Sequence, residues 1–270
     1  MKKLFLLVFL SSIFCINSFS AKPIIPPGTV KINDSLFIDK NEVRNVDYIE
    51  FLYWTEKEYG RDSQEYLFIL PDTTVWETKH TYGEPMKNIY FRHPAYNNYP
   101  LVGISIEQAI MYCDWRTDRV NEILHIKINK ISYDSLKNIA DIPKYVEYRL
   151  PTIEEWEYVA NQPYSEKTLK RMNKKKHKGI KRTNLYNNDV GALPSDNTSI
   201  TAPVSSYWPN QLGVFNIIGN AAELTSKEGV AKGGSWSHRP EEVSVEAIFK
   251  YEKPESWLGF RCVCDMHIQI

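Results

Sequence analysis

Hydrophobic positions along the chain predict a few helices separated by long stretches without a regular period. Hydrophobic side chains repeat at helical spacing after Ser105, and the predicted buried face consists of Ile106, Ala109, Ile110, Cys113 and Val120. Ser105 and Gln108 have the types and spacing of a capping box, which marks where this helix begins. The pattern therefore predicts a long helix that buries Cys113.

Two further segments have helical patterns. Asn45 fits an N-cap and Asp47 suits the first turn, and the face predicted to be buried there consists of Val46, Ile49 and Tyr53. Thr152 and Glu155 form a second capping box after a proline. The hydrophobic stripe of that helix consists of Ile153, Trp156 and Ala160.

The remaining segments predict short strands and loops. A turn at Pro26-Pro27-Gly28 is followed by expected strands at 29–32 and 36–39. We interpret residues 60–104 as a long irregular excursion, and the basic stretch 167–182 as a solvated loop. Two or three helices among many short strands indicate an α+β fold, which we expect to form one domain over residues 21–270.

The first twenty residues have the pattern of a signal peptide. Lys2 and Lys3 precede a hydrophobic run, and small residues precede a cleavage point ahead of Ala21. The run is too short for a permanent transmembrane helix. We therefore expect residues 1–20 to be removed and the protein to be exported, to the periplasm or cell envelope. The alternative is a lipoprotein anchored through Cys15, although the bulky side chains before that cysteine are poor for lipid attachment.

Composition and charge narrow the classes of partner. The chain has 270 residues, 43% of them hydrophobic, with 33 basic and 33 acidic residues and no net charge. This balance excludes the basic field of a typical nucleic-acid-binding protein. Three cysteines remain after signal cleavage, so one disulfide and one odd thiol are expected in an oxidising compartment.

Common catalytic motifs are absent from the sequence. Ser235 follows two glycines but lacks the later glycine of a nucleophile elbow, and no phosphate-binding glycine loop or H-E-x-x-H motif occurs. The cysteines and histidines do not have zinc-site spacing. The residue patterns alone therefore indicate an exported α+β domain without a defined activity.

Six stretches in order resemble the formylglycine-generating enzyme (sulfatase-modifying factor) family: FIDKNEVRNVDYIEFL, YPLVGISIEQAIMYCDWRT, YRLPTIEEWEYVA, TAPVSSYWPNQLGVFNIIGNAAE, KGGSW and GFRCV. The resemblance covers nearly the whole mature chain. It implies a loop-rich variant of the C-type-lectin-like architecture.

A narrower resemblance involves LPDTTVWETKHTYGEPMKNIYFRHPAYNNYPLVG and CDWRTDRVNE. These stretches are similar to gliding-motility and type IX secretion lipoproteins of Bacteroidetes-like bacteria. That branch includes a periplasmic ring component attached to the outer membrane. The present chain is short for the branch and has a poor lipid-attachment site.

The resemblance also locates a degenerate catalytic loop. In the active oxidases, one cysteine follows the G-G-S-aromatic turn after one intervening residue, and a second lies five residues further on; together they bind copper. His238 and Val243 occupy these positions here. Copper(I) sites of this kind need soft thiolate ligands. We therefore expect no copper cofactor, no catalytic residues of the oxidase type, and a GGSW segment that forms a tight turn leading to a core tryptophan.

Two structural calcium sites are implied by the resemblance. The first would use Asn216, Gly219, Ala221 and Glu223. The second would use Asn184, Leu185, Asp196 and Thr198, with Asp189 as a substitute in a stretch that is shorter than usual. Amide, carboxylate and carbonyl oxygens suit this hard cation. The alternative is that Asn216 and Glu223 only cap turns.

The family disulfide corresponds to a bond between Cys113 and Cys262, which leaves Cys264 as a buried odd thiol. The favoured function is then a non-catalytic envelope protein that binds other envelope or secretion-machinery proteins, with association to the outer membrane. A second hypothesis is a metal-dependent oxidase rebuilt around His238 and Cys264. A third, a carbohydrate-binding module, rests on lectin-like topology alone.

Overall fold

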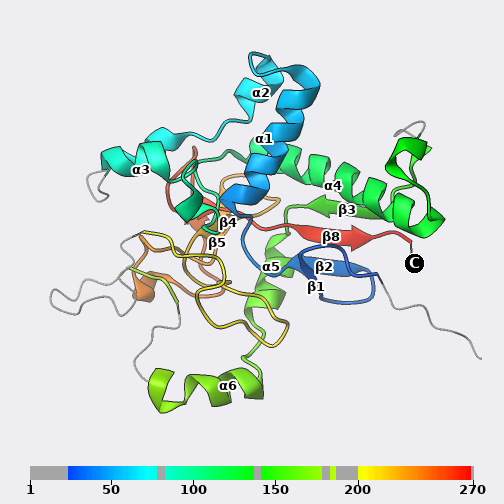
Figure 1. Cartoon of the computed structure of the whole chain (residues 1–270). Helices are drawn as coiled ribbons and strands as arrows, with labels where there is room; N and C mark the ends of the chain where they lie inside the picture. Colours follow the sequence, from blue (N-terminus) through cyan, green and yellow to red (C-terminus); the bar gives the residue numbers. More distant parts are fainter. Residues whose placement is uncertain (1–23, 78–82, 137–140, 178–182, 187–199, 269–270) are drawn as a thin grey trace, which may run out of the picture.

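The computed structural model describes residues 24–77, 83–136, 141–177, 183–186 and 200–268. The predicted signal peptide and Cys15 lie outside these residues. Short strands, helices and long loops alternate along the described chain, which confirms the predicted loop-rich α+β class (Figure 1).

The first sheet joins the two ends of the chain. Its order is β1 (Thr29–Lys31), β2 (Leu36–Asp39), β8 (Val263–Met266) and β3 (Val146–Arg149), with every pair antiparallel. The two expected N-terminal strands form a hairpin, whose turn is held by the side-chain oxygen of Asn33 accepting from the backbone of Ser35 and Leu36. β8, near the C-terminus, lies between β2 and β3 (Figure 1).

The second sheet is built from strands of only two or three residues. Its order is β6 (Phe249–Lys250), β5 (Val230–Lys232), β4 (Ala222–Leu224) and β7 (Leu258–Gly259). β4 and β7 are parallel, and the other pairs are antiparallel. This sheet positions the GGSW segment, which follows β5 directly.

Helix α4 (Ile106–Asn129) begins where the sequence predicts. Ser105 is the N-cap, its hydroxyl accepts from the backbone of Gln108, and the Gln108 side chain accepts from the backbone of Ser105. Four of the five predicted face residues are buried, but Ile110 is 46% exposed. α4 packs along β3, so its buried stripe follows the strand and excludes Ile110.

Helix α1 (Asn45–Tyr59) confirms the predicted element but not its predicted face. Its N-cap is Arg44, because the Asn45 side chain instead donates to two buried carbonyls, those of Tyr90 and Tyr96. Tyr53 is 54% exposed, while the buried residues of the helix are Asn45, Tyr48, Phe51, Leu52 and Thr55. Aromatic packing against α4, which includes a stacked Tyr48–Tyr112 pair, selects this face.

The interpretation of residues 60–104 as irregular is wrong in part. The described residues there contain α2 (Gln64–Phe68), η1 (Thr73–Trp76), α3 (Gly83–Ile89) and η2 (Pro94–Tyr96). The side chains of Ser63, Asp72 and His93 cap three of these short elements. Such local N-caps stabilise helices of only one or two turns, which are too short for a hydrophobic period to appear.

Three more helical segments follow β3. The predicted capping box of Thr152 and Glu155 starts α5 (Ile153–Ala160), which buries Trp156 fully. The stretch expected to be a solvated loop contains α6 (Glu166–Met172) and η5 (Lys175–His177), because Ser165 caps α6 and Thr168 and Met172 are buried. The described residues thus hold six α-helices rather than two or three, plus a short 3-10 turn η3 (Tyr133–Ser135).

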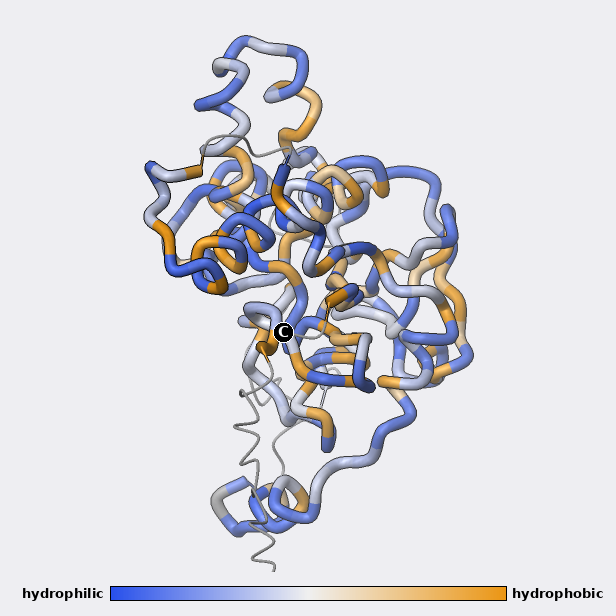
Figure 2. The backbone as a smooth tube through the Cα atoms, turned by 90° about the vertical axis from the view of Figure 1, so that its right-hand side faces the viewer, coloured by the Kyte–Doolittle hydropathy of each residue, from blue (hydrophilic) through white to orange (hydrophobic). Residues whose placement is uncertain are grey.

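Most core residues belong to one hydrophobic cluster between α1, α4 and the sheets. Hydrophilic and hydrophobic residues alternate along most of the chain trace (Figure 2). Within the described residues, no helix has both the length and the hydrophobicity needed to cross a bilayer.

Candidate functional site

The glycine turn after β5 brings three parts of the chain together. Gly233 and Gly234 both have positive φ angles, of 89° and 67°. A Cβ on Gly233 would lie 2.8 Å from the carbonyl oxygen of Ile217, and one on Gly234 would lie 2.5 Å from a methyl carbon of Val243. Conformation and space therefore both require glycine. The turn leads to Trp236, which is buried and stacks on Trp76 at 6.1 Å, as the sequence suggested.

His238 lies in a small aromatic setting beside this turn. Its Nδ1 is 2.7 Å from the hydroxyl oxygen of Ser235, and its ring centroid lies 4.3 Å from that of Phe249 and 5.0 Å from that of Trp257. Burial lowers the pKa of His238 below its ordinary value of 6.5. The imidazole is therefore mainly neutral at pH 7 and held as part of the packing.

The three described cysteines lie away from the loop position that the resemblance assigns to copper ligands. Val243, at the second of the two positions, packs its methyl groups against Gly234 and the core. Cys264 lies on β8 of the first sheet, and burial raises the pKa of its thiol to about 12. At neutral pH this sulfur is a protonated thiol, a poor nucleophile and a poor metal ligand.

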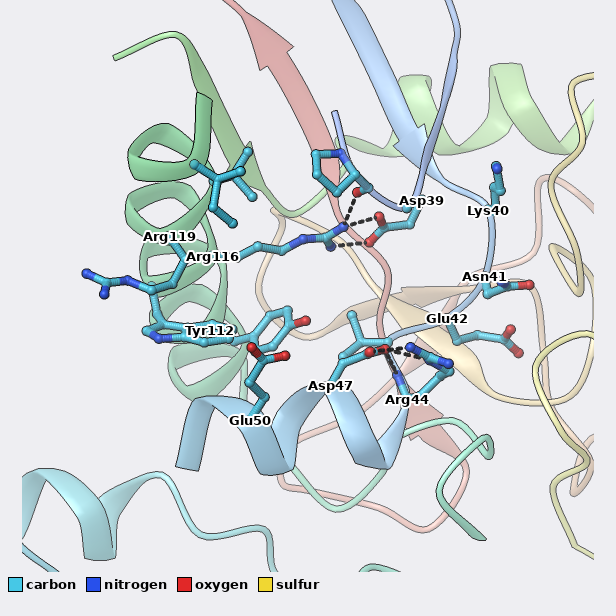
Figure 3. Close-up of a pocket in the computed structure, with 16 residues that line it drawn as sticks. Asp39, Lys40, Asn41, Glu42, Arg44, Asp47, Glu50, Tyr112, Arg116 and Arg119 are labelled. Carbon is cyan, nitrogen blue, oxygen red and sulfur yellow. Dashed lines mark hydrogen bonds and ion pairs between the residues drawn. The ribbon is translucent and has the colours of Figure 1, made fainter. Parts of the chain in front are cut away.

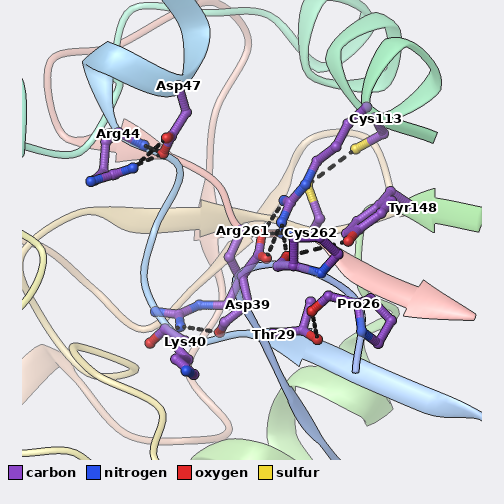
Figure 4. A network of polar contacts seen from close by, with 12 residues as sticks. Pro26, Thr29, Asp39, Lys40, Arg44, Asp47, Cys113, Tyr148, Arg261 and Cys262 are labelled. Atoms are coloured by element: carbon purple, nitrogen blue, oxygen red, sulfur yellow. Dashed lines mark hydrogen bonds and ion pairs between the residues drawn. The ribbon is translucent and has the colours of Figure 1, made fainter. Parts of the chain in front are cut away.

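Cys113 and Cys262 are neighbours in the core. Their sulfur atoms lie 3.5 Å apart, between α4 and the segment before β8 (Figure 4). Both are thiols here, whereas a disulfide has an S–S distance of about 2.05 Å. The implied bond stays a prediction for the oxidised protein.

A fully buried ion pair connects the second sheet with α5. Arg261 donates from Nε and Nη2 to the two carboxylate oxygens of Glu223, at 2.7 and 2.6 Å. The indole of Trp156 donates to Glu223 at 2.8 Å. Arg261 also donates to the backbone carbonyls of Asp39 and Phe215, so one guanidinium links four segments.

Glu42 forms a second buried polar centre beside this ion pair. The side-chain amide of Asn220 donates to its carboxylate at 2.8 Å, and that of Asn216 at 3.3 Å. Burial raises the pKa of Glu42 to about 8, so it is largely protonated at pH 7. The side-chain oxygen of Asn216 is buried and has no hydrogen-bond partner within the described residues.

The first predicted calcium set fits the ion in part. Asn216, with a positive φ of 50°, offers its unpaired oxygen, and a Cβ on Gly219 would lie 2.8 Å from the carbonyl oxygen of Asn184. Glu223 already accepts from Arg261 and Trp156 through both oxygens, and Ala221 is buried. The described residues contain no group of three or more His, Cys, Asp or Glu side chains suited to a metal.

The second predicted calcium set lies only partly in the described residues. The Asn184 side chain donates to the carbonyl of Ile200, and its own carbonyl accepts from the backbone of Asn220. Leu185 follows directly. Asp196, Thr198 and the substitute Asp189 lie outside the described residues. The structure therefore brings the described parts of the two predicted sets together, because the Asn184 carbonyl lies against Gly219 and accepts from Asn220 beside it.

Sequence reasoning missed the residues that organise this centre. Glu42, Asn220 and Arg261 all stand inside the stretches that carry the family resemblance, yet none was assigned a role. Their partners are distant in sequence, since Glu42 and Asn220 are 178 residues apart. The only available signal was Arg261 within the otherwise uncharged stretch GFRCV; Glu42 stands among other polar residues in FIDKNEV and gave none.

Comparisons with known proteins confirm the family resemblance that these stretches of sequence carry. The family model described as the sulfatase-modifying factor enzyme 1-like domain matches residues 14–266. The chain is 26% identical over 280 residues to the formylglycine-generating enzyme of Mus musculus, covering 86% of this chain and 66%, just under two thirds, of that protein. It is 24% identical over 263 residues to the inactive C-alpha-formylglycine-generating enzyme 2 of Bos taurus, covering 83% of this chain and 75% of that protein. A solved structure of CarF covers 88% of this chain and 96% of its own at 17% identity, with a TM-score of 0.49.

Proposed function

Because the chain belongs to the sulfatase-modifying factor enzyme 1-like domain family, we propose that it is a non-catalytic member that acts by binding other proteins. The observation that carries the proposal is the loop after β5. Where the resemblance expects two copper-binding cysteines, it has a neutral, packed histidine at 238 and a valine at 243. One of the relatives bears the name of an inactive enzyme, which supports the idea that the scaffold persists without the activity.

The proposed setting is the cell envelope. Its support is the signal-peptide pattern of residues 1–20 and the resemblance of residues 70–103 and 113–122 to gliding-motility and type IX secretion lipoproteins. The proposed partners are accordingly proteins of the envelope or of the secretion machinery, at the periplasmic side of the outer membrane. Mass spectrometry of the mature N-terminus decides between cleavage ahead of Ala21 and lipidation of Cys15.

Calcium has a structural role in this proposal. The unpaired oxygen of Asn216 supports it, because a hard cation accepts such a ligand. Calcium that binds only the folded state raises the melting temperature. We expect a chelator to lower the melting temperature of the wild type, and to have no such effect on Asn216→Ala. If a chelator does not change the melting temperature of the wild type, calcium has no structural role. The centre is then held by the protein's own contacts, chiefly the ion pair of Arg261 and Glu223.

A turnover experiment tests the loss of catalysis. The purified protein is incubated with a cysteine-containing peptide, copper and oxygen, and formylglycine is measured by mass spectrometry. We expect none from the wild type. The double variant His238→Cys, Val243→Cys is the matched test of whether the two sulfurs are what the loop lacks. Formylglycine made by the wild type and lost in His238→Ala would establish the rebuilt oxidase instead.

The binding role needs a separate test. The tagged protein is purified from native envelopes, and each recovered protein is then tagged in turn. Reciprocal recovery at a fixed ratio supports the proposal. Recovery in one direction only, or of a set that varies between preparations, counts against it.

A further inference from the structure

Two segments at opposite ends of the molecule expose hydrophobic side chains among charges of opposite sign. The first, residues 50–68, contains the second half of α1 and all of α2, and we call it the acidic lobe. The second, residues 166–175, contains α6, and we call it the basic segment. α2 lies at one end of the fold and α6 at the other (Figure 1), and the view turned by 90° agrees (Figure 2).

The acidic lobe has an exposed hydrophobic surface. Tyr53 and Tyr59 on α1 are 54% and 53% exposed, and Leu67 and Phe68 at the end of α2 are 55% and 53% exposed. Single exposed hydrophobic side chains are common on soluble proteins, whereas several on one small element with a charged rim are typical of interaction surfaces. The lobe is therefore a candidate docking surface, and its charges indicate the kind of partner.

The charge of the lobe is not neutralised by the rest of the chain. Its acidic residues are Glu50, Glu56, Glu58, Asp62 and Glu65, against two basic ones, and none of the five forms an ion pair within the described residues. Where α1 faces the body, charges are paired instead: Arg44 donates to Asp47, and Arg116 on α4 donates to Asp39 (Figure 3). Carboxylates and aromatic rings both attract Lys and Arg, so the expected partner is a basic segment with a hydrophobic side chain of its own.

The chain itself contains such a segment. Residues 166–175 hold one acidic residue and five basic ones: Lys167, Lys170, Arg171, Lys174 and Lys175. Leu169 lies among them and is 40% exposed. Thr168 and Met172 are buried, so α6 is attached to the body and presents its charged face outward. In charge and in hydrophobic content, the basic segment therefore complements the acidic lobe.

We propose that the acidic lobe of one copy of the chain binds the basic segment of a second copy. Because the two surfaces lie at opposite ends, they do not meet within one molecule, and the contact between copies is head to tail. Each contact leaves one lobe and one basic segment free, so further copies can add. The inference goes beyond the proposed binding of envelope proteins and does not depend on it.

Sedimentation velocity of the mature protein over a concentration series tests the proposal. At low salt we expect the average mass to rise with concentration. In about 0.5 M NaCl we expect it to return to that of the monomer, because salt screens exposed charges. A lobe variant, Glu58→Lys with Asp62→Lys, and a segment variant, Lys167→Glu with Lys174→Glu, should each weaken association about tenfold or more, since every reversal replaces an attraction by a repulsion.

Mixing the two variants gives the sharpest result. The lobe variant keeps an intact basic segment, and the segment variant keeps an intact lobe, so the mixture can form one contact and no more. We expect dimers of one copy of each variant, whereas the wild type continues to larger species. The control variant Asp134→Lys with Glu241→Lys changes the net charge as the lobe variant does, at exposed positions in η3 and η6 outside both surfaces, and should associate like the wild type.

All six positions are exposed, and circular dichroism reports whether each variant is folded. Three results would overturn the proposal. The first is a wild type that stays monomeric at low salt, and the second is a mixture of the two variants that forms no dimer. The third is a control variant that loses association as the lobe variant does, because net charge rather than the lobe would then be responsible.

Discussion

Replacing Asn121 by alanine should strongly destabilise the fold, because this side chain completes the free edge of β3. Its oxygen accepts from the backbone N–H groups of Tyr145 and Val146, and its nitrogen donates to the carbonyl of Val146 at 2.9 Å. One helical turn earlier, the Thr117 hydroxyl accepts from the N–H of Tyr148 at 2.8 Å. The outward-facing backbone groups of β3 are thus satisfied by α4 rather than by another strand.

The expected magnitude follows from these three bonds. Asn121 is 6% exposed, so its removal leaves two amides and one carbonyl buried without partners. At about 1–3 kcal/mol for each such group, reduced where water enters the vacated space, we expect a loss of about 3–5 kcal/mol. That is a large fraction of the 5–15 kcal/mol typical of a folded domain. Asn121→Asp keeps an oxygen that can accept from both N–H groups but loses the donor, so its stability should fall between those of the wild type and Asn121→Ala.

Urea unfolding followed by circular dichroism measures the free energies. Asn129→Ala is the matched control, since it makes the same substitution at the exposed end of α4, where the side chain bonds only within its own helix, to His125. We expect the control to change stability by less than about 0.5 kcal/mol. If Asn121→Ala and Asn129→Ala differ by less than about 1 kcal/mol, side chains of α4 do not secure β3 in the way described.

Three other substitutions probe the core. Arg261→Met should lower the free energy of unfolding by about 3–5 kcal/mol, because Glu223 would remain buried without its cation. Urea unfolding of the variant and the wild type measures this difference. Cys113→Ser should lower the free energy of unfolding of the oxidised protein by up to about 4–5 kcal/mol if the disulfide to Cys262 forms, and by much less under dithiothreitol. A loss of stability that is the same with and without reductant argues against the disulfide. For His238, the folded pKa is below 6.5, so the unfolded state binds the proton more readily and stability should fall as pH drops below 6.5. His238→Asn should flatten that part of the melting-temperature profile.

Features set by neighbouring residues could be predicted from the sequence. The capping boxes at Ser105 and Thr152 located the starts of α4 and α5, because each consists of contacts three residues apart. The N-terminal hairpin was found for the same reason. Family resemblance supplied the fold and pointed to the loop at His238, which composition and spacing alone could not do.

Features set by distant residues were missed. The buried face of α1 depends on the Tyr112 ring, which lies more than fifty residues later, so periodicity selected Tyr53 instead of Tyr48. The centre around Glu42 and Arg261 depends on contacts across most of the chain. A charged residue taken by itself is expected to lie in solvent. Only the assembled fold shows that Arg261 is buried against Glu223 and that Glu42 is buried against the amide of Asn220.

The position of β8 has a consequence for how the protein is made. β8 pairs with both β2 and β3 and is translated after both of them, so a chain still on the ribosome carries two strands with open edges. Such edges invite pairing with other chains. Keeping the chain unfolded until β8 emerges would avoid that interval. A chain truncated before Val263 would never leave it.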